Sequence, residues 1–164
     1  MRERTKKITL LGLCAAVALL LSYIEMLLPP IYAAIPGIKV GLPNVAILFI
    51  LYRYGWKEAA AVSFVRLALS TLLFGNVTML WYSLAGAVLS LAVMAVFKKI
   101  GWFSTVGVSI LGGVMHNLGQ VLVAMLLLET AEIGYYMFVL AFSGTLAGIF
   151  IGLAGALLLK KLRI

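Results

Sequence analysis

The sequence predicts an all-α integral membrane protein that forms a single domain over residues 1–164. Hydrophobic residues make up 65% of the chain and the mean hydropathy is +1.18, whereas soluble domains are about 45–50% apolar. The apolar residues fall into long runs, and most charged residues lie between these runs. We therefore expect six transmembrane helices in a lipid bilayer, with no soluble domain attached.

The first helix is expected over residues 8–28, after a basic head at residues 1–7. A basic head followed by an apolar run also describes a cleaved signal peptide. Because this run continues through Glu25 and is followed by further apolar runs, we expect the first helix to be retained. The other helices are expected over residues 44–54, 59–74, 78–97, 105–128 and 135–159.

The second of these helices is unusually short. The stretch from Pro43 to Tyr54 reaches only about 18 Å, against about 30 Å for the hydrocarbon core of a bilayer. Either this helix does not span, or the loop before it, residues 35–44 (IPGIKVGLPN), lies at membrane depth. Irregular backbone there must be buried in protein or line a watery cavity, and such interruptions point to transporter binding sites. The loop is interpreted either as the wall of a ligand pocket or as a plain loop before a tilted helix.

The basic residues predict the orientation of the chain. Of the 13 Lys and Arg, all except Lys39 and Arg66 fall in segments that share one side of the membrane with both termini. The positive-inside rule makes that side the cytoplasm. We therefore expect a multi-pass protein of the cytoplasmic membrane, with both termini cytoplasmic and residues 35–44 outside. Because the charges sit at helix ends, the net charge of +8 reflects topology, and no nucleic-acid partner is expected.

One charged residue, Arg66, is expected near mid-depth in the third helix. A charge there costs about 2.5–3.5 kcal/mol on insertion scales, so it normally faces the bundle interior with a partner or a substrate. Two partners remain open, the carboxylate of Glu25 and a bound anion.

The fifth helix carries His116, Asn117 and Gln120, of which the first and last share a face. These side chains are expected either to form hydrogen bonds between helices or to line a pocket. With one His, one Cys and no Asp in the chain, we expect neither a metal site nor a disulfide, and no cofactor.

Three more polar residues complete the candidate site. Asn44 and Asn76 precede apolar runs, where they either cap helices or line the mouth of a pocket. Lys39 is either a solvated loop residue or a hook for an anion. Together the candidates suit a small molecule with an anionic or carbonyl-bearing head and an apolar body. The expected substrate-binding residues are Lys39, Asn44, Arg66, Asn76, His116, Asn117 and Gln120.

Small residues predict surfaces where helices approach closely. In the sixth helix Gly144, Gly148 and Gly152 follow one another at intervals of four, and we expect them to pack inside the protein. The first helix has small residues on two faces, for which internal packing and docking of a separate membrane subunit both remain open. The candidate docking residues are Gly12, Cys14, Ala16, Ala18 and Ser22.

The segments GLCAAVALLLSYIEMLLP and IPGIKVGLPNVAILFILYRYGWKEAAAVSFVRLALSTLLFGN resemble the Gx transporter family, also named heptaprenyl diphosphate synthase component I. The resemblance covers essentially the whole chain, and PGIKVGLPN and the Arg66 helix ending in FGN are its most specific parts. The wider architecture is similar to the substrate-binding S components of energy-coupling-factor (ECF) vitamin transporters.

This resemblance implies a six-helix bundle with both termini inside and a ligand pocket on the outer side. It also implies docking, through an AxxxA face on the first helix, to an ECF transmembrane subunit that works with two ATPases. Here the matching face departs from AxxxA. By association with flavin-based electron-transfer and menaquinone genes, the ligand implied is a vitamin or a flavin- or quinone-related molecule.

The synthase name does not agree with the acidic residues. Prenyl diphosphate synthases hold Mg²⁺ and the substrate diphosphate with paired Asp-rich motifs, because hard Mg²⁺ needs carboxylate oxygens. This chain has no Asp and only five acidic residues, mostly scattered, so we do not expect it to be an enzyme for that reaction. It also lacks a Gly-rich phosphate loop ending in Lys-Ser/Thr, so any hydrolytic power would come from partners.

The leading hypothesis is a membrane protein that binds a small molecule on its outer side and delivers it inward. The alternative from another class is a non-catalytic membrane subunit that assists polyprenyl diphosphate or menaquinone synthesis. A third is a membrane anchor for an extracellular electron-transfer system.

Overall fold

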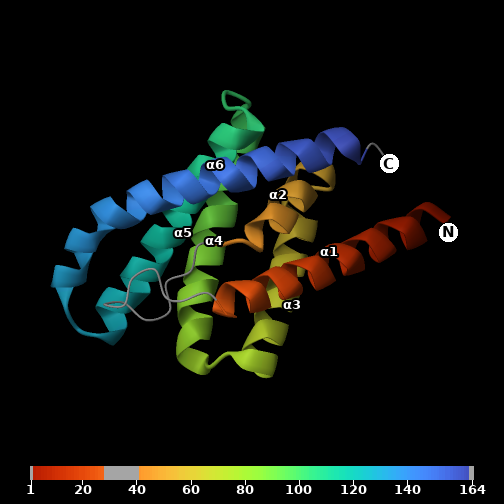
Figure 1. Cartoon of the computed structure of the whole chain (residues 1–164). Coiled ribbons are helices and arrows are strands. Elements are labelled where there is room, and N and C mark those ends of the chain that lie inside the picture. Colours follow the sequence, from red (N-terminus) through yellow and green to blue (C-terminus); the bar gives the residue numbers. More distant parts are fainter. Residues whose placement is uncertain (1, 28–40, 163–164) are drawn as a thin grey trace.

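The computed structural model describes residues 2–27 and 41–162, and every regular element within them is a helix (Figure 1). The six predicted helices are all present, and a short 3₁₀ helix precedes the last of them. Several begin or end a few residues from the predicted bounds, the largest difference being the basic head, which continues the first helix. The elements are α1 (Arg2–Leu27), α2 (Asn44–Arg53), α3 (Trp56–Phe74), α4 (Val77–Ile100), α5 (Thr105–Leu127), η1 (Ala131–Tyr136) and α6 (Met137–Lys161).

Four stretches are long and apolar enough to cross a membrane, namely Glu3–Leu27, Val77–Ile100, Thr105–Leu127 and Ala131–Lys161. The other two helices fall short for different reasons. α2 has 10 residues, which reach only about 15 Å. α3 has 19 residues but carries Lys57, Glu58 and Arg66. The chain is therefore a multi-pass membrane protein, with four spans supported by length and composition and two helices that need protein around them.

The shortest helix is also the most deeply buried. α2 contacts α1, α3 and α6, and Asn44 and residues 46–51 are all buried. A helix that is apolar on every side is stable only when it is covered on every side. α2 thus forms the centre of the bundle, and the longer helices surround it (Figure 1).

Glycines bring α5 and α6 into backbone contact. A Cβ added to Gly148 would lie 2.6 Å from the Cα of Ile110, and one added to Gly113 would lie 2.3 Å from the carbonyl oxygen of Gly144. Gly152 meets Val106 in the same way, at 2.7 Å. The small-residue face of the sixth helix therefore packs inside the protein, as predicted.

The small residues of α1 divide between a buried and an exposed face. Cys14, Ala18 and Ser22 are buried, on the helix that contacts α2 and α3. Gly12 and Ala16 are exposed, and a Cβ added to Gly12 would meet no atom within 4 Å. Three of the five candidate docking residues are therefore covered by the chain itself, which leaves Gly12 and Ala16 on a free surface.

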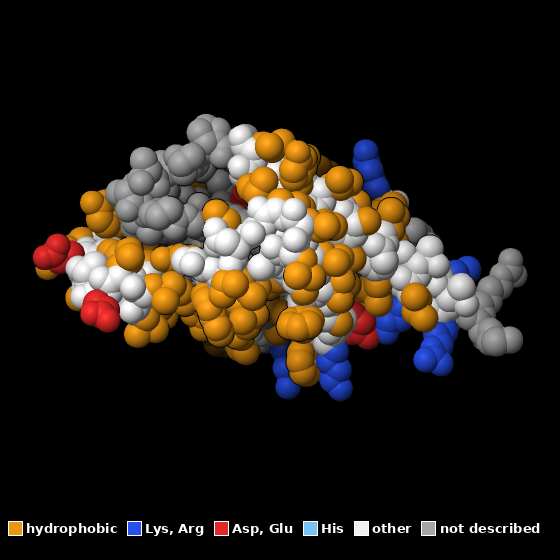
Figure 2. Space-filling model, turned by 90° about the horizontal axis from the view of Figure 1, so that it is seen from below, with side chains coloured by type: hydrophobic (Ala, Val, Ile, Leu, Met, Phe, Trp, Pro, Cys, Tyr) orange, Lys and Arg blue, Asp and Glu red, His pale blue; other side chains and the backbone are white. Residues whose placement is uncertain are grey.

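The two ends of the bundle differ in charge. We call the end that holds both described chain termini the basic end, because helix ends there carry Lys7, Arg53, Lys57, Lys98, Lys99, Lys160 and Lys161. The opposite, acidic end carries Glu129 and Glu132. Figure 2 shows Lys and Arg side chains gathered over one part of the molecule and two acidic side chains at its far extremity.

Polar contacts tie helices together at the basic end. Lys7 of α1 forms an ion pair with Glu58 of α3 at 2.6 Å, and its ammonium also lies over the ring of Tyr54, 5.4 Å from the centroid. Lys98 of α4 donates to the carbonyl oxygen of Leu51, in the last turn of α2, at 2.5 Å. α1, α2, α3 and α4 are thereby fixed to one another where the basic residues cluster.

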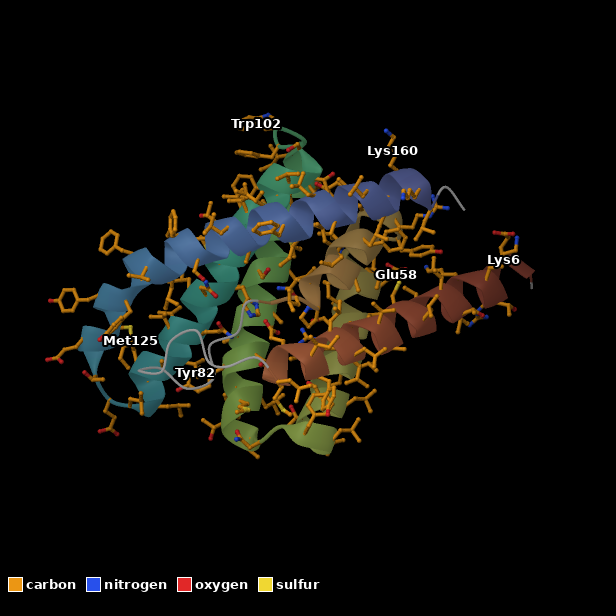
Figure 3. The ribbon with its side chains drawn as sticks, in the orientation of Figure 1. Lys6, Glu58, Tyr82, Trp102, Met125 and Lys160 are labelled. Atoms are coloured by element: carbon orange, nitrogen blue, oxygen red, sulfur yellow. The ribbon has the colours of Figure 1, made fainter. Side chains whose placement is uncertain are left out.

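The buried apolar residues form two clusters, one toward each end. The basic-end cluster includes α2 and, from the longer helices, Cys14, Val62, Met94, Val108 and Ile151. The acidic-end cluster consists of Tyr82, Val121, Ala124, Ile133 and Leu140. In Figure 3, Tyr82 and Met125 lie well away from Lys160 and Glu58, which mark the basic end.

Candidate functional site

Buried polar side chains lie between the two apolar clusters. On α5, His116 and Gln120 come between Val108 of the basic-end cluster and Val121 of the acidic-end cluster. The buried polar residues at this level come from five different helices. We call the following set the polar layer: Glu25, Asn44, Arg66, His116, Asn117 and Gln120.

The start of α2 is held by a carboxylate from α1. Glu25 accepts hydrogen bonds from the backbone N–H groups of Gly41 and Leu42, the latter at 3.4 Å. A negative charge is favourable where N–H groups lead into a helix, because the helix dipole is positive there. The first turn then closes with the N–H of Asn44 donating to the carbonyl of Gly41 at 2.9 Å. Glu25 therefore fixes the point at which α2 begins.

Gly41 brings three helices of the polar layer together. Its φ of +88° lies in the region that favours glycine. A Cβ added there would lie 2.9 Å from Nδ2 of Asn44 and 3.9 Å from Cδ2 of His116. Because Gly41 also donates to Glu25, the side chains of Glu25, Asn44 and His116 converge on one backbone position from α1, α2 and α5.

His116 fits into the bundle because the facing residue of α4 has no side chain. A Cβ added to Gly86 would lie 2.9 Å from both Cε1 and Nδ1 of the imidazole. The ring is 5% exposed, so it lies between α4 and the start of α2. Substituents at Gly86 would displace it.

Arg66 is a buried cation on the inner side of α3. Its side chain is 7% exposed, and its charge interacts favourably with that of Glu25. The buried Nε has no hydrogen-bond partner in the part of the chain that the structure describes. Nor does Arg66 form a direct ion pair with another described residue. Both partners considered from the sequence thus remain relevant, since the Glu25 charge acts on Arg66 without occupying its donors.

Gln120 is the most completely enclosed polar side chain of the layer. It is 0% exposed, and neither its Oε1 nor its Nε2 has a hydrogen-bond partner among residues 2–27 and 41–162. Most buried polar atoms in proteins are hydrogen-bonded. Two orphaned atoms on one buried amide therefore call for a partner that the described chain does not supply.

The remaining candidates have other roles or lie elsewhere. Asn117 donates through Nδ2 to the carbonyl oxygen of Leu140 at 2.7 Å and so links α5 to α6. Asn76 is exposed and caps α4, accepting from the N–H of Met79 at 2.8 Å. Lys39, with residues 35–40 of the expected pocket wall, lies outside the described residues. The structure therefore brings together Asn44, Arg66, His116 and Gln120 from the candidate set.

Sequence reasoning did not identify three contributors to the site. Gly41 and Gly86 serve as contact surfaces for His116, and Ser90, one turn from Gly86 on α4, has a buried hydroxyl without a hydrogen-bond partner among the described residues. Their roles depend on which helices face one another, and a single sequence carries no direct signal of that pairing.

A family model described as heptaprenyl diphosphate synthase component I matches residues 14–158. The chain belongs to this family. The matched residues include the entire polar layer and both apolar clusters. No curated protein and no solved structure gives a significant match to the chain.

This member of the heptaprenyl diphosphate synthase component I family has a site made for recognition by hydrogen bonds. It offers the guanidinium of Arg66, the amide of Gln120 and the imidazole of His116 within a largely apolar interior. Within the described residues, His, Cys and acidic side chains form no group of three that could hold a metal ion. The one carboxylate in the layer, Glu25, is already engaged by the backbone of Gly41 and Leu42.

Proposed function

We propose that this protein binds a small molecule in the polar layer and carries it across the membrane, as a substrate-binding component of the ECF S-component kind. The ligand would be a vitamin or a flavin- or quinone-related molecule with a polar head and an apolar body. Energy would come from partners, such as an ECF transmembrane subunit with its ATPases, because the chain has no phosphate-binding loop of its own.

The observation that carries this proposal is the state of Arg66. A guanidinium has five N–H donors and stays charged, so burying it at membrane depth is costly unless acceptors surround it. Glu25 supplies charge but makes no direct ion pair with Arg66. An anionic or carbonyl group of a ligand would supply the missing acceptor.

The architecture favours entry from the acidic end. The basic end is tied by the Lys7–Glu58 ion pair and the Lys98–Leu51 hydrogen bond, and the basic-end cluster fills the space behind the polar layer. The positive-inside rule makes the basic end cytoplasmic and the acidic end external. On this basis both termini are cytoplasmic, and the ligand is taken up from outside.

The family name supports a second candidate function. A component of a heptaprenyl diphosphate synthase would be a membrane subunit that assists a separate catalytic chain in polyprenyl diphosphate or menaquinone synthesis. We propose a non-catalytic role in that case, because the chain has no Asp with which to build the usual magnesium sites. An anchor for an electron-transfer complex is a variant of the same idea.

Native mass spectrometry of the protein, extracted gently from its own membrane, tests both candidates. The transport proposal expects one small molecule per chain, lost at least tenfold in Arg66→Ala and partly kept in Arg66→Lys. Arg53→Ala is the matched control, because Arg53 is an exposed arginine at the end of α2. A bare chain that travels with a prenyltransferase or redox subunit would refute the transport proposal and support the second candidate.

A further inference from the structure

We propose that the ligand presents a hydrogen-bond donor next to an acceptor, as in a cyclic amide, an imide or a carboxamide, and that Gln120 reads this edge. The inference rests on the proposed function and narrows its ligand class. It excludes ligands whose polar groups are acceptors alone, which include simple quinones and prenyl diphosphates.

The two unpaired atoms of Gln120 set this requirement. Oε1 can only accept and Nε2 can only donate, and both are buried without a partner among the described residues. A ligand made of carbonyl or phosphate oxygens would satisfy Nε2 and leave Oε1 orphaned. Exchanging the two atoms by turning the amide over changes nothing, because either orientation presents one donor and one acceptor side by side.

The position of Gln120 on α5 directs it toward the start of α2. At about 100° per residue, Gln120 lies between the directions of His116 and Asn117. His116 meets Gly86 of α4 and lies near Gly41, while Asn117 is bonded to Leu140 of α6. Gln120 therefore faces the interior between α4 and α6, one turn from the ring that contacts the residues leading into α2.

The neighbours of Gln120 indicate the rest of the ligand. Val121 and Ala124 follow it on α5 and belong to the acidic-end cluster with Tyr82 and Leu140. Arg66 lies in the same layer, on the opposite side of the bundle core. A flat heterocycle with an amide or imide edge for Gln120, apolar faces for this cluster and an acceptor group for Arg66 matches all three environments.

Gln120→Met provides the test, because methionine has a similar length and no donor or strong acceptor. Ligand retention in the full-length protein should fall at least tenfold. The ligand-free variant should melt at a higher temperature than ligand-free wild type, because two orphaned buried groups are gone. This rise excludes misfolding as the cause of the lost ligand. Leu126→Met, at an exposed position two turns away on α5, is the control and should change neither quantity.

The identity of the retained molecule gives the second readout, by accurate mass and fragmentation. An N–H or O–H beside a carbonyl or ring nitrogen supports the inference. A quinone, a prenyl diphosphate or any other molecule with acceptors alone overturns it, as does undiminished retention in Gln120→Met. In both cases loss of the molecule in Arg66→Ala would leave the proposed function standing. A wild-type protein that retains nothing contradicts the function and the inference together.

Discussion

Glu25 on α1 and Arg66 on α3 are the two buried charged side chains of the described chain, and their charges attract each other. The Glu25 carboxylate is held by the backbone N–H groups of Gly41 and Leu42, whereas the Nε of Arg66 has no hydrogen-bond partner among the described residues. The pair is therefore unequal. One charge is fixed in place by the start of α2, and the other keeps donors available.

Replacing one member of this pair should destabilise the protein more than replacing both. Glu25→Leu leaves the Arg66 charge buried without an opposite charge, which costs about 3–5 kcal/mol in buried ion pairs. The double variant Glu25→Leu/Arg66→Leu should recover more than half of that loss. Denaturant unfolding in detergent micelles measures both, and Glu132→Leu, an exposed acid at the other end, is the control. Strictly additive effects would show that the two charges do not interact.

A methyl group on the inner face of α6 should loosen the bundle. Gly148→Ala would place a Cβ 2.6 Å from the Cα of Ile110, so the α5 and α6 backbones must separate, at a cost of about 1–3 kcal/mol. Gly12→Ala is the matched control, since its Cβ meets nothing within 4 Å. We expect a clear fall in melting temperature for the first and none for the second. Equal behaviour of the two variants would contradict the packing described here.

Substitution of Gly86 should disturb ligand retention without touching a candidate ligand contact. In Gly86→Ala the new Cβ would lie 2.9 Å from the ring and the carbonyl oxygen of His116, so the imidazole must move away from its place beside Gly41. We expect retention of the bound molecule to fall about tenfold in native mass spectrometry. Gly134→Ala, whose Cβ makes only ordinary contacts at 3.9 Å, should retain it. Normal retention in Gly86→Ala would remove His116 from the site.

Introduced cysteines should report the orientation of the bundle in intact cells. We expect Glu132→Cys to react with a membrane-impermeant maleimide and Lys57→Cys to react only after the cells are permeabilised, because the basic end is retained in the cytoplasm. The native Cys14 is buried, so its background labelling should be low. The reverse pattern would invert the proposed topology and, with it, the direction of uptake.

The helices of this protein could be located from the sequence because apolar runs of membrane length are interrupted by charged or Gly- and Pro-containing turns. Even the exceptional α2 was found, since its shortness is a local property. The buried polar residues were also found, because Arg66, His116 and Gln120 each stand within an apolar run. Local features of the chain thus determine which residues are unusual.

Contacts between distant segments were the part that the sequence did not reveal. The Glu25–Gly41 hydrogen bond uses a backbone donor, which every residue except proline possesses. The buried face of α1 was equally ambiguous, because small residues occur both at Gly12 and Ala16 and at Cys14, Ala18 and Ser22. Only the position of α2 and α3 decides which face is covered.

The burial of α2 also imposes an order on biosynthesis. Leu48 of α2 packs against Gly155 of α6, a residue made about 100 positions later, which takes about 5–20 s at usual translation rates. During that interval a helix of 10 residues, too short to span lipid alone, has only α1 and α3 beside it. The nascent chain must therefore keep α2 sheltered by the insertion machinery or by the α1–α3 pair until α6 arrives. Completion of the bundle is consequently a late event that follows release of the last helix.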